Sequence, residues 1–141
     1  ESTLKNGISK PVASFVIPLC ATIHLSGSMI KLTLYAFAIV YMANLDISTS
    51  TGLGFIFLLG IMMIAAPGVP GGAVMVAAGL LADMMGFDDG MVALMIAAYI
   101  AIDSVGTAAN VTGDGAIAMI VDKFAGDKKG PTEEEPAEAT A

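Results

Sequence analysis

Three long apolar blocks dominate this sequence, and each is interrupted by polar, glycine or proline residues. Hydrophobic residues make up 56% of the 141 residues and charged residues only 13%, and the mean hydropathy is +0.82. A soluble domain of this size could not bury so much apolar surface. The blocks therefore predict an all-α integral membrane protein, and the interruptions are the informative part of the pattern.

The first block, residues 11–43, is interrupted by the polar, glycine-containing segment 22–28. We expect a transmembrane helix that is broken near the middle of the bilayer. Backbone groups freed at such a break cannot face lipid, because an unpaired amide costs several kcal/mol in hydrocarbon. The break should therefore face a cavity lined by protein.

The second block has two apolar arms, residues 53–66 and 73–85, joined by Pro-Gly-Val-Pro-Gly-Gly at 67–72. At about 1.5 Å per residue, each arm reaches only roughly 20 Å, less than the approximately 30 Å of the hydrocarbon core. The prolines and glycines favour a sharp reversal, so residues 53–85 predict a re-entrant helical hairpin. A single kinked helix is the alternative, which this density of helix breakers disfavours.

The third block, residues 91–124, predicts one long transmembrane helix with four polar side chains, at Asp103, Thr107, Asn110 and Asp114. At about 100° per residue, the last three lie within roughly 40° of the first around the helix axis. The four side chains are therefore expected to form one narrow polar stripe.

Charge patterning predicts the orientation of the chain. Two lysines precede the first block and three lie at or after the end of the last, whereas segments 44–52 and 83–90 contain acids and no lysine. The positive-inside rule then places both termini in the cytoplasm. The acidic, proline-containing tail, residues 126–141, predicts disorder.

Composition also excludes some classes of function. The basic residues are scattered lysines and the chain has no Trp, so the aromatic-basic pattern of nucleic-acid binders is missing and no nucleic-acid partner is expected. The single Cys20 lies in an apolar run. It predicts a buried structural thiol rather than a disulfide or a cysteine-based metal site.

Two carboxylates, Asp103 and Asp114, lie inside the third block, where an ionisable group indicates function by default. The structural alternative for Asp103 is a position near a helix end, paired with a lysine from a segment outside this chain. Carboxylate and amide oxygens, supplemented by carbonyls of a broken helix, suit a hard monovalent cation. The sequence therefore predicts a cation site at Asn110 and Asp114.

An intramembrane aspartyl protease is the enzymatic alternative, since such enzymes use two aspartates. Residues eleven apart on one helix are separated by roughly 16 Å, too far to share a proton. Asp103 and Asp114 therefore cannot form a dyad within this chain, although each could meet a partner from elsewhere.

Two further polar residues have open interpretations. His24 lies in the first break beside Ser26, and it is either a neutral histidine lining a cavity or a proton-handling or ligand-contacting group. Lys31 is the only lysine well inside an apolar block. It either snorkels or serves as the counter-ion of a carboxylate.

Three motifs occur in a fixed order: Pro-Leu-Cys-Ala-Thr-Ile at 18–23, Gly-Val-Pro-Gly at 68–71 and Asn-Val-Thr-Gly-Asp at 110–114. They resemble the start of the seventh helix, the second hairpin tip and the last helix of the glutamate-transporter type of dicarboxylate/amino acid:cation symporters. Residues 1–9 resemble the end of the first hairpin of that family. The resemblance extends to about residue 126 and implies that six earlier helices lie outside this chain.

The resemblance implies roles for individual residues. Asn110 and Asp114 would bind sodium, and Asp103 and Thr107 would hold the amino group and side chain of the substrate. The implied substrate site also includes Asn110, Gly106, Val69 and Ser28. The implied cation site also includes His24 and Ser26. The implied gate consists of Pro67, Gly68, Pro70 and Gly71.

At the level of the whole protein, the resemblance implies that residues 10–125 form the C-terminal part of a transport domain. That domain would move like an elevator within a homotrimer in a bacterial-type plasma membrane. The hairpin at 53–85 would be its extracellular gate.

Two departures from the family pattern bear on selectivity. Gly106 stands where members with acidic substrates have an arginine, so no guanidinium can pair bidentately with a second substrate carboxylate. The family's Asn-Met-Asp-Gly-Thr break reads His-Leu-Ser-Gly-Ser at 24–28, which removes one amide and one carboxylate from the expected sodium shells. Lys31 could supply the lost positive charge for an acidic substrate.

The expected function is secondary active symport of an amino acid or dicarboxylate coupled to sodium or a proton, with a small neutral amino acid preferred. No enzymatic activity is expected, and no cofactor beyond the coupling cation. The expected partners are the small-molecule substrate, membrane lipid and the earlier helices of the same transporter. A passive membrane channel and a non-transporting membrane subunit are the alternatives.

Overall fold

The computed structural model describes residues 1–66 and 69–125. Within these residues the structure is entirely helical, as expected, and contains no strand. The helices are α1 (Ser2–Lys5), α2 (Lys10–Ile23), α3 (Ser26–Met42), α4 (Thr49–Met63), α5 (Gly72–Met85), α6 (Asp89–Ala101) and α7 (Asp103–Ala125). The tail predicted to be disordered, residues 126–141, lies outside the described residues.

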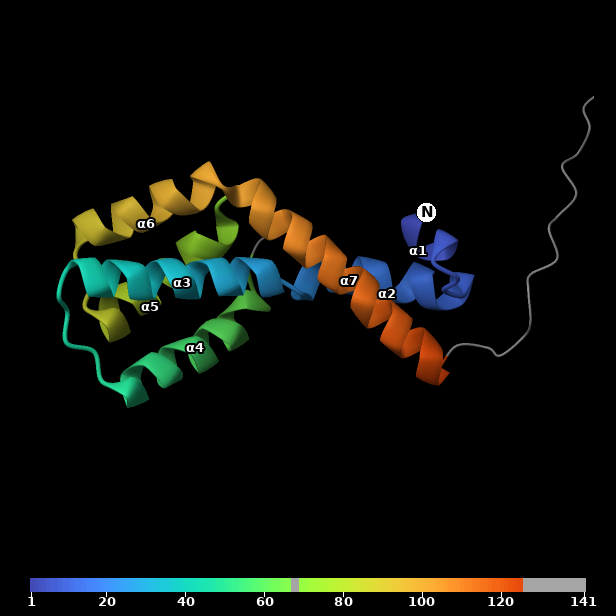
Figure 1. Cartoon of the computed structure of the whole chain (residues 1–141), viewed down its shortest axis with the longest axis horizontal. Coiled ribbons are helices and arrows are strands. Elements are labelled where there is room, and N and C mark those ends of the chain that lie inside the picture. The colour runs from blue at the N-terminus through green and yellow to red at the C-terminus, as the bar shows by residue number, and fades with distance from the viewer. Residues whose placement is uncertain (67–68, 126–141) are drawn as a thin grey trace, which may run out of the picture.

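The molecule is elongated, with two packed ends joined by α3 and α7 (Figure 1). At one end, α3 lies among α4, α5 and α6, and α4 packs against α5. At the other end, α2 packs against α7, close to α1 and the N-terminus. Because α7 contacts both α2 and α3, it crosses the point at which these two helices meet.

Each end has its own apolar core. The larger core is shared by α3, α4, α5 and α6 and is centred on side chains such as Phe55, Leu81 and Tyr99. The smaller core lies between α2 and α7 and contains Cys20 and Ala118. Cys20 is a buried free thiol, as predicted.

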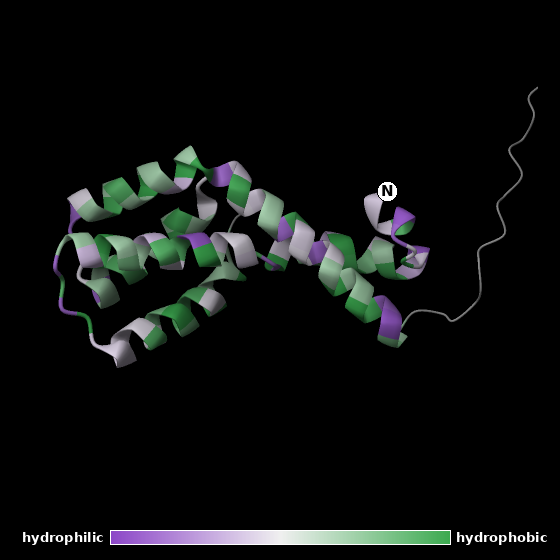
Figure 2. Cartoon of the chain, in the orientation of Figure 1, coloured by the Kyte–Doolittle hydropathy of each residue, from purple (hydrophilic) through white to green (hydrophobic). Residues whose placement is uncertain are grey.

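Apolar residues run along most of the helices (Figure 2), and many large apolar side chains among them are exposed. Phe15, Phe57 and Tyr41 are 69%, 70% and 85% exposed. Large apolar side chains exposed in such number indicate contact with lipid or with further helices. The helical stretch Lys10–Met42 is long and apolar enough to cross a membrane, and the bent pair α6 and α7 passes the same test taken together.

The helical stretch at 11–43 is interrupted where its polar segment lies. Helix α2 ends at Ile23, and α3 begins at Ser26 after extended backbone at His24. The residue at the N-cap position of α3, Leu25, makes no capping hydrogen bond through its side chain. The freed N–H groups of its first turn therefore need acceptors from another element.

The prediction of one uninterrupted helix over residues 91–124 was wrong. The helix ends at Ala101, leaves helical geometry at Ile102 and restarts at Asp103 with a bend of 64°. A polar contact stabilises the bend, because the Lys31 ammonium group donates hydrogen bonds to Tyr99 O at 3.2 Å and to Ile102 O at 3.4 Å. Asp103, in the first turn of α7, also suits the positive end of the helix dipole.

The turn between α4 and α5 is short, and residues 67–68 within it lie outside the described residues. Gly71 begins α5 with a φ of 76°, a left-handed conformation that glycine adopts readily. Helices α4 and α5 contact each other. Val69 and Pro70, which lie between them in the chain, line the same cavity as His24 and Leu25 at the α2–α3 break.

Candidate functional site

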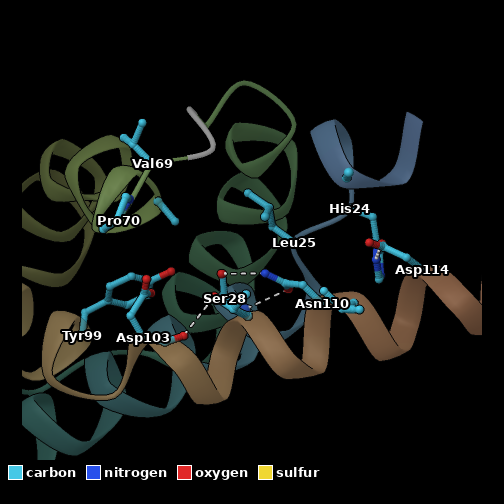
Figure 3. A pocket seen from close by; sticks show the side chains of 13 residues that line it. His24, Leu25, Ser28, Val69, Pro70, Tyr99, Asp103, Asn110 and Asp114 are labelled. Carbon is cyan, nitrogen blue, oxygen red and sulfur yellow. Dashed lines mark hydrogen bonds and ion pairs between the residues drawn. The ribbon is translucent and has the colours of Figure 1, made fainter. Parts of the chain in front are cut away.

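A cavity of about 280 Å³ lies where the α2–α3 break, the start of α5 and the α6–α7 bend come together (Figure 3). Three segments far apart in the sequence thus contribute to one space. Its lining residues are Ala21, His24, Leu25, Ser28, Val69, Pro70, Ala73, Tyr99, Asp103, Thr107, Asn110, Val111 and Asp114.

The four polar residues of the α7 stripe all line this cavity: Asp103, Thr107, Asn110 and Asp114. The helical spacing therefore brings them to one face, as the sequence indicated. Thr107 donates its hydroxyl to the Asp103 carbonyl of its own helix at 3.2 Å. The other three side chains make hydrogen bonds to α3 or to the segment before it.

Asn110 caps the N-terminus of α3. Its amide oxygen accepts hydrogen bonds from the backbone N–H groups of Gly27 at 2.8 Å and Ser28 at 3.3 Å. Its amide nitrogen donates to Ser28 Oγ at 3.2 Å. These contacts satisfy N–H groups that the break would otherwise leave unpaired.

The cap requires close approach of the two helices. A Cβ atom at Gly27 would lie 2.5 Å from the carbonyl oxygen of Gly106 and 2.6 Å from Cβ of Ala109. Only glycine fits at this crossing without a shift of the backbone. Gly27, in the first turn of α3, therefore allows α7 to reach the helix start next to the break.

His24 and Asp114 form a second pair at the α2–α3 break. His24 Nδ1 lies 2.7 Å from Asp114 Oδ1, and the side chains are 22% and 9% exposed. Gly113 leaves room for the imidazole, because a Cβ atom there would overlap it. The carboxylate is thus nearly buried and has one polar partner at the end of the cavity (Figure 3).

Lys31 is paired with Asp103, so the counter-ion interpretation of this lysine is confirmed. Its Nζ lies 3.2 Å from Asp103 Oδ1 and 3.6 Å from the centre of the Tyr99 ring. The lysine side chain is only 7% exposed, whereas that of Asp103 is 30% exposed. Asp103 faces the cavity, and Lys31 lies behind it, outside the lining.

Gly106, which we predicted to belong to the substrate site, does not line the cavity. A Cβ atom at this position would lie 3.1 Å from Lys31 Nζ and 3.2 Å from Cε. The lysine therefore fills the space beside the glycine. An additional cationic side chain at position 106 would meet it directly.

Only some of the remaining predicted site residues line the cavity. Val69 and Pro70 line the cavity, whereas Ser26 does not. Gly71 packs near Ile100 rather than into the cavity. The predicted gate residues Pro67 and Gly68 lie outside the described residues.

Tyr99 also lines the cavity, although the sequence pattern did not assign it to the site. It lies four residues before Asp103, an offset that would place the two side chains on one face of an unbroken helix. That offset is the signal that could have identified it. The apolar lining residues Leu25 and Val111 had no such signal, because nothing separates them from other membrane-facing residues in the sequence.

The donors at the cavity suit a monovalent cation better than a transition metal. Within the described residues, no three His, Cys, Asp or Glu side chains gather in one place. Asp114 supplies a nearly buried carboxylate. The amide oxygen of Asn110 is already engaged with two N–H groups, so Asp114 is the stronger candidate ligand.

Comparison with known proteins is consistent with this geometry. The model of the sodium:dicarboxylate symporter family matches residues 1–124, which includes every residue that lines the cavity. No solved structure matches the chain. The chain therefore belongs to the sodium:dicarboxylate symporter family, a membership that implies cation-coupled symport by an integral membrane protein rather than an enzymatic reaction.

Proposed function

We propose that the cavity binds the transported substrate together with a coupling cation, and that the tip of the α4–α5 hairpin closes over it. The convergence of Asp103, Asn110 and Asp114 on one cavity carries this proposal. Val69 and Pro70, at the hairpin tip, form the opposite wall. Their position supports the gate role proposed for residues 67–71.

In the membrane, we place α2 and α3 as a broken span and α4 and α5 as a re-entrant hairpin. The 15 residues of α4 and the 14 of α5 are each too short to cross a hydrocarbon core of about 30 Å. Helices α6 and α7 then form the second, bent span. With this arrangement both termini lie in the cytoplasm, in agreement with the flanking lysines.

The chain is proposed to act as the C-terminal part of a transport domain, with residues 1–9 completing the first hairpin. It would work with earlier helices of the same transporter, in a homotrimer within a bacterial-type plasma membrane. The exposed apolar side chains of α2 and α4, such as Phe15 and Phe57, would face those helices or lipid.

The preferred substrate is a small amino acid with a neutral side chain. Asp103 faces the cavity with a carboxylate that can receive the substrate's amino group. No lysine is among the cavity-lining residues that the structure describes, and the chain contains no arginine. A second substrate carboxylate would therefore be buried without its usual partner, at a cost of several kcal/mol.

Sodium or a proton is proposed as the coupling cation, with Asp114 as its main anionic group. Neutralising this nearly buried carboxylate would stabilise the loaded cavity. Asn110 would contribute by exchanging one of its backbone partners for the ion. His24 and Ser26 would complete the surroundings of the ion.

A dicarboxylate is the second candidate substrate. The position of Lys31 beside Gly106 favours it, because the ammonium group lies close to the place from which an arginine would extend. The lysine would have to turn away from Tyr99 O and Ile102 O to reach the cavity. This requirement makes the neutral substrate the better fit.

A protease function is disfavoured because each aspartate has a different basic partner. Asp103 is paired with Lys31 and Asp114 with His24. The two carboxylates therefore do not contact each other, as sharing a proton would require.

Uptake into proteoliposomes that contain the complete transporter tests the proposal. An inward sodium or proton gradient should drive accumulation of alanine or serine at low concentration, and excess aspartate or succinate should compete weakly. Stronger competition by succinate than by serine would favour the dicarboxylate. Equilibration without accumulation would indicate a channel, and no uptake of any of these solutes would indicate a non-transporting subunit.

A further inference from the structure

Lys31 lies in surroundings that resemble the coordination shell of a cation. Its ammonium group contacts three oxygen atoms, at 3.2 Å from Tyr99 O, 3.4 Å from Ile102 O and 3.2 Å from Asp103 Oδ1. The face of the Tyr99 ring covers it at 3.6 Å. A monovalent cation is commonly held by this combination of carbonyls, a carboxylate and an aromatic face.

The fold creates a need for positive charge at this point. Helix α6 ends at Ala101, and the carbonyls of its last turn have no partners within the helix. The negative end of the helix dipole is therefore directed at the bend, where the Asp103 carboxylate adds a full negative charge. The positive end of the α7 dipole offsets part of this charge, and a cation at the bend compensates the rest.

The same surroundings make Lys31 a poor substrate ligand. Its side chain is 7% exposed, and it is not among the residues that line the cavity. Its ammonium group can donate three hydrogen bonds, and the three oxygen atoms account for all of them. The lysine is therefore fully occupied with the bend.

We propose that the ammonium group of Lys31 is a tethered cation that permanently fills a monovalent-cation site formed by Tyr99, Ile102 and Asp103. A free ion is not needed at this position while the lysine is present. Removal of the ammonium group opens the site to a free cation of similar size. This inference goes beyond the proposed symport and does not depend on its substrate or its coupling ion.

The Lys31→Met variant tests the inference, because methionine keeps most of the apolar stem and vacates the place of Nζ. The complete transporter would be purified in detergent, and its thermal unfolding midpoint measured in ammonium chloride and in tetramethylammonium chloride of equal ionic strength. Ammonium matches the vacated group, whereas tetramethylammonium is too large for it.

Ammonium should raise the unfolding midpoint of Lys31→Met in a saturable manner relative to tetramethylammonium, or should be required to recover folded protein. The wild type should behave alike in both salts. So should Lys10→Met, in which an exposed lysine is replaced. Asp103→Asn/Lys31→Met loses both charges. Because the carboxylate is missing, the ammonium concentration that gives half of the maximal shift should be at least about tenfold higher in this variant than in Lys31→Met.

Equal behaviour of Lys31→Met in the two salts, whether folded in both or unfolded in both, would overturn the inference. This measurement requires neither sodium nor transport. A transporter that fails every uptake assay but gains an ammonium site in Lys31→Met would refute the proposed symport and leave the tethered cation in place.

Discussion

The imidazole of His24 lies 2.7 Å from the carboxylate of Asp114, although 90 residues separate them in the chain. This contact joins the break between α2 and α3 to the polar face of α7 (Figure 3). It gives a nearly buried carboxylate a polar partner.

Replacing His24 with alanine should therefore destabilise the cation-free protein. Asp114 would lose its partner, at a cost of about 1–3 kcal/mol. Sodium should recover part of that loss by neutralising the carboxylate. Thermal unfolding midpoints measured with and without sodium should show a larger sodium effect in His24→Ala than in the wild type.

Thr112→Ala is a suitable control, since the exposed hydroxyl of Thr112 bonds only to Ala108 O of its own helix. Its stability should stay within about 0.5 kcal/mol of the wild type. If His24→Ala were as stable as this control in the absence of sodium, the pair would have no stabilising role.

The cap that Asn110 provides for α3 leads to a second prediction. Asn110→Ala removes the acceptor for the N–H groups of Gly27 and Ser28, and should lower the free energy of unfolding by about 1–2 kcal/mol. Asn110→Asp keeps an acceptor oxygen and should lose less. Denaturant titration of both variants measures the difference, and an Asn110→Asp variant less stable than Asn110→Ala would argue against the cap.

Close packing of α3 on α7 predicts a strong effect of a single methyl group. Gly27→Ala would place Cβ 2.5 Å from the Gly106 carbonyl oxygen, and the forced separation should cost about 1–3 kcal/mol. Gly79→Ala is the matched control, because a Cβ atom in that part of α5 meets nothing within 4 Å. It should be neutral or stabilising by about 0.5–1 kcal/mol. Equal thermal stability of the two variants would contradict the packing described here.

Position 106 offers a test of substrate selectivity. An arginine there would supply a bidentate partner for a second substrate carboxylate, but it would start beside the Lys31 ammonium group. Gly106→Arg alone should therefore shift preference toward acidic substrates only weakly. Gly106→Arg combined with Lys31→Met should shift the ratio of aspartate to serine inhibition constants by at least about tenfold. Unchanged ratios in both variants would show that position 106 lies away from the substrate.

Much of this arrangement could be predicted from local sequence. The polar stripe of α7 follows from helical periodicity alone, and the interruption at 24–25 follows from a polar, glycine-containing segment within an apolar block. The break at Ile102 could not be predicted in this way. Neither proline nor glycine marks it, and its partner Lys31 lies 71 residues away in the sequence.

Contacts between side chains of different helices could not be predicted from local sequence either. The sequence suggested a carboxylate partner for Lys31 but could not choose between Asp103 and Asp114, because that choice depends on how α3 docks on α7. The docking itself rests on Gly27, whose missing side chain allows the contact. In sequence this glycine indicated only a helix break.

Gradient-driven uptake by the Asp114→Asn variant tests the central claim most directly, with Asp122→Asn as control. Asp122 also lies on α7, but its carboxylate bonds to Ser9 N and Oγ, away from the cavity. We expect Asp122→Asn to accumulate substrate normally. At low sodium, Asp114→Asn should accumulate at least about tenfold less substrate than the wild type. This difference is equivalent to a loss of roughly 1.4 kcal/mol in the free energy of cation binding. Accumulation by Asp114→Asn equal to that of the wild type would contradict a cation-coupled site at this cavity.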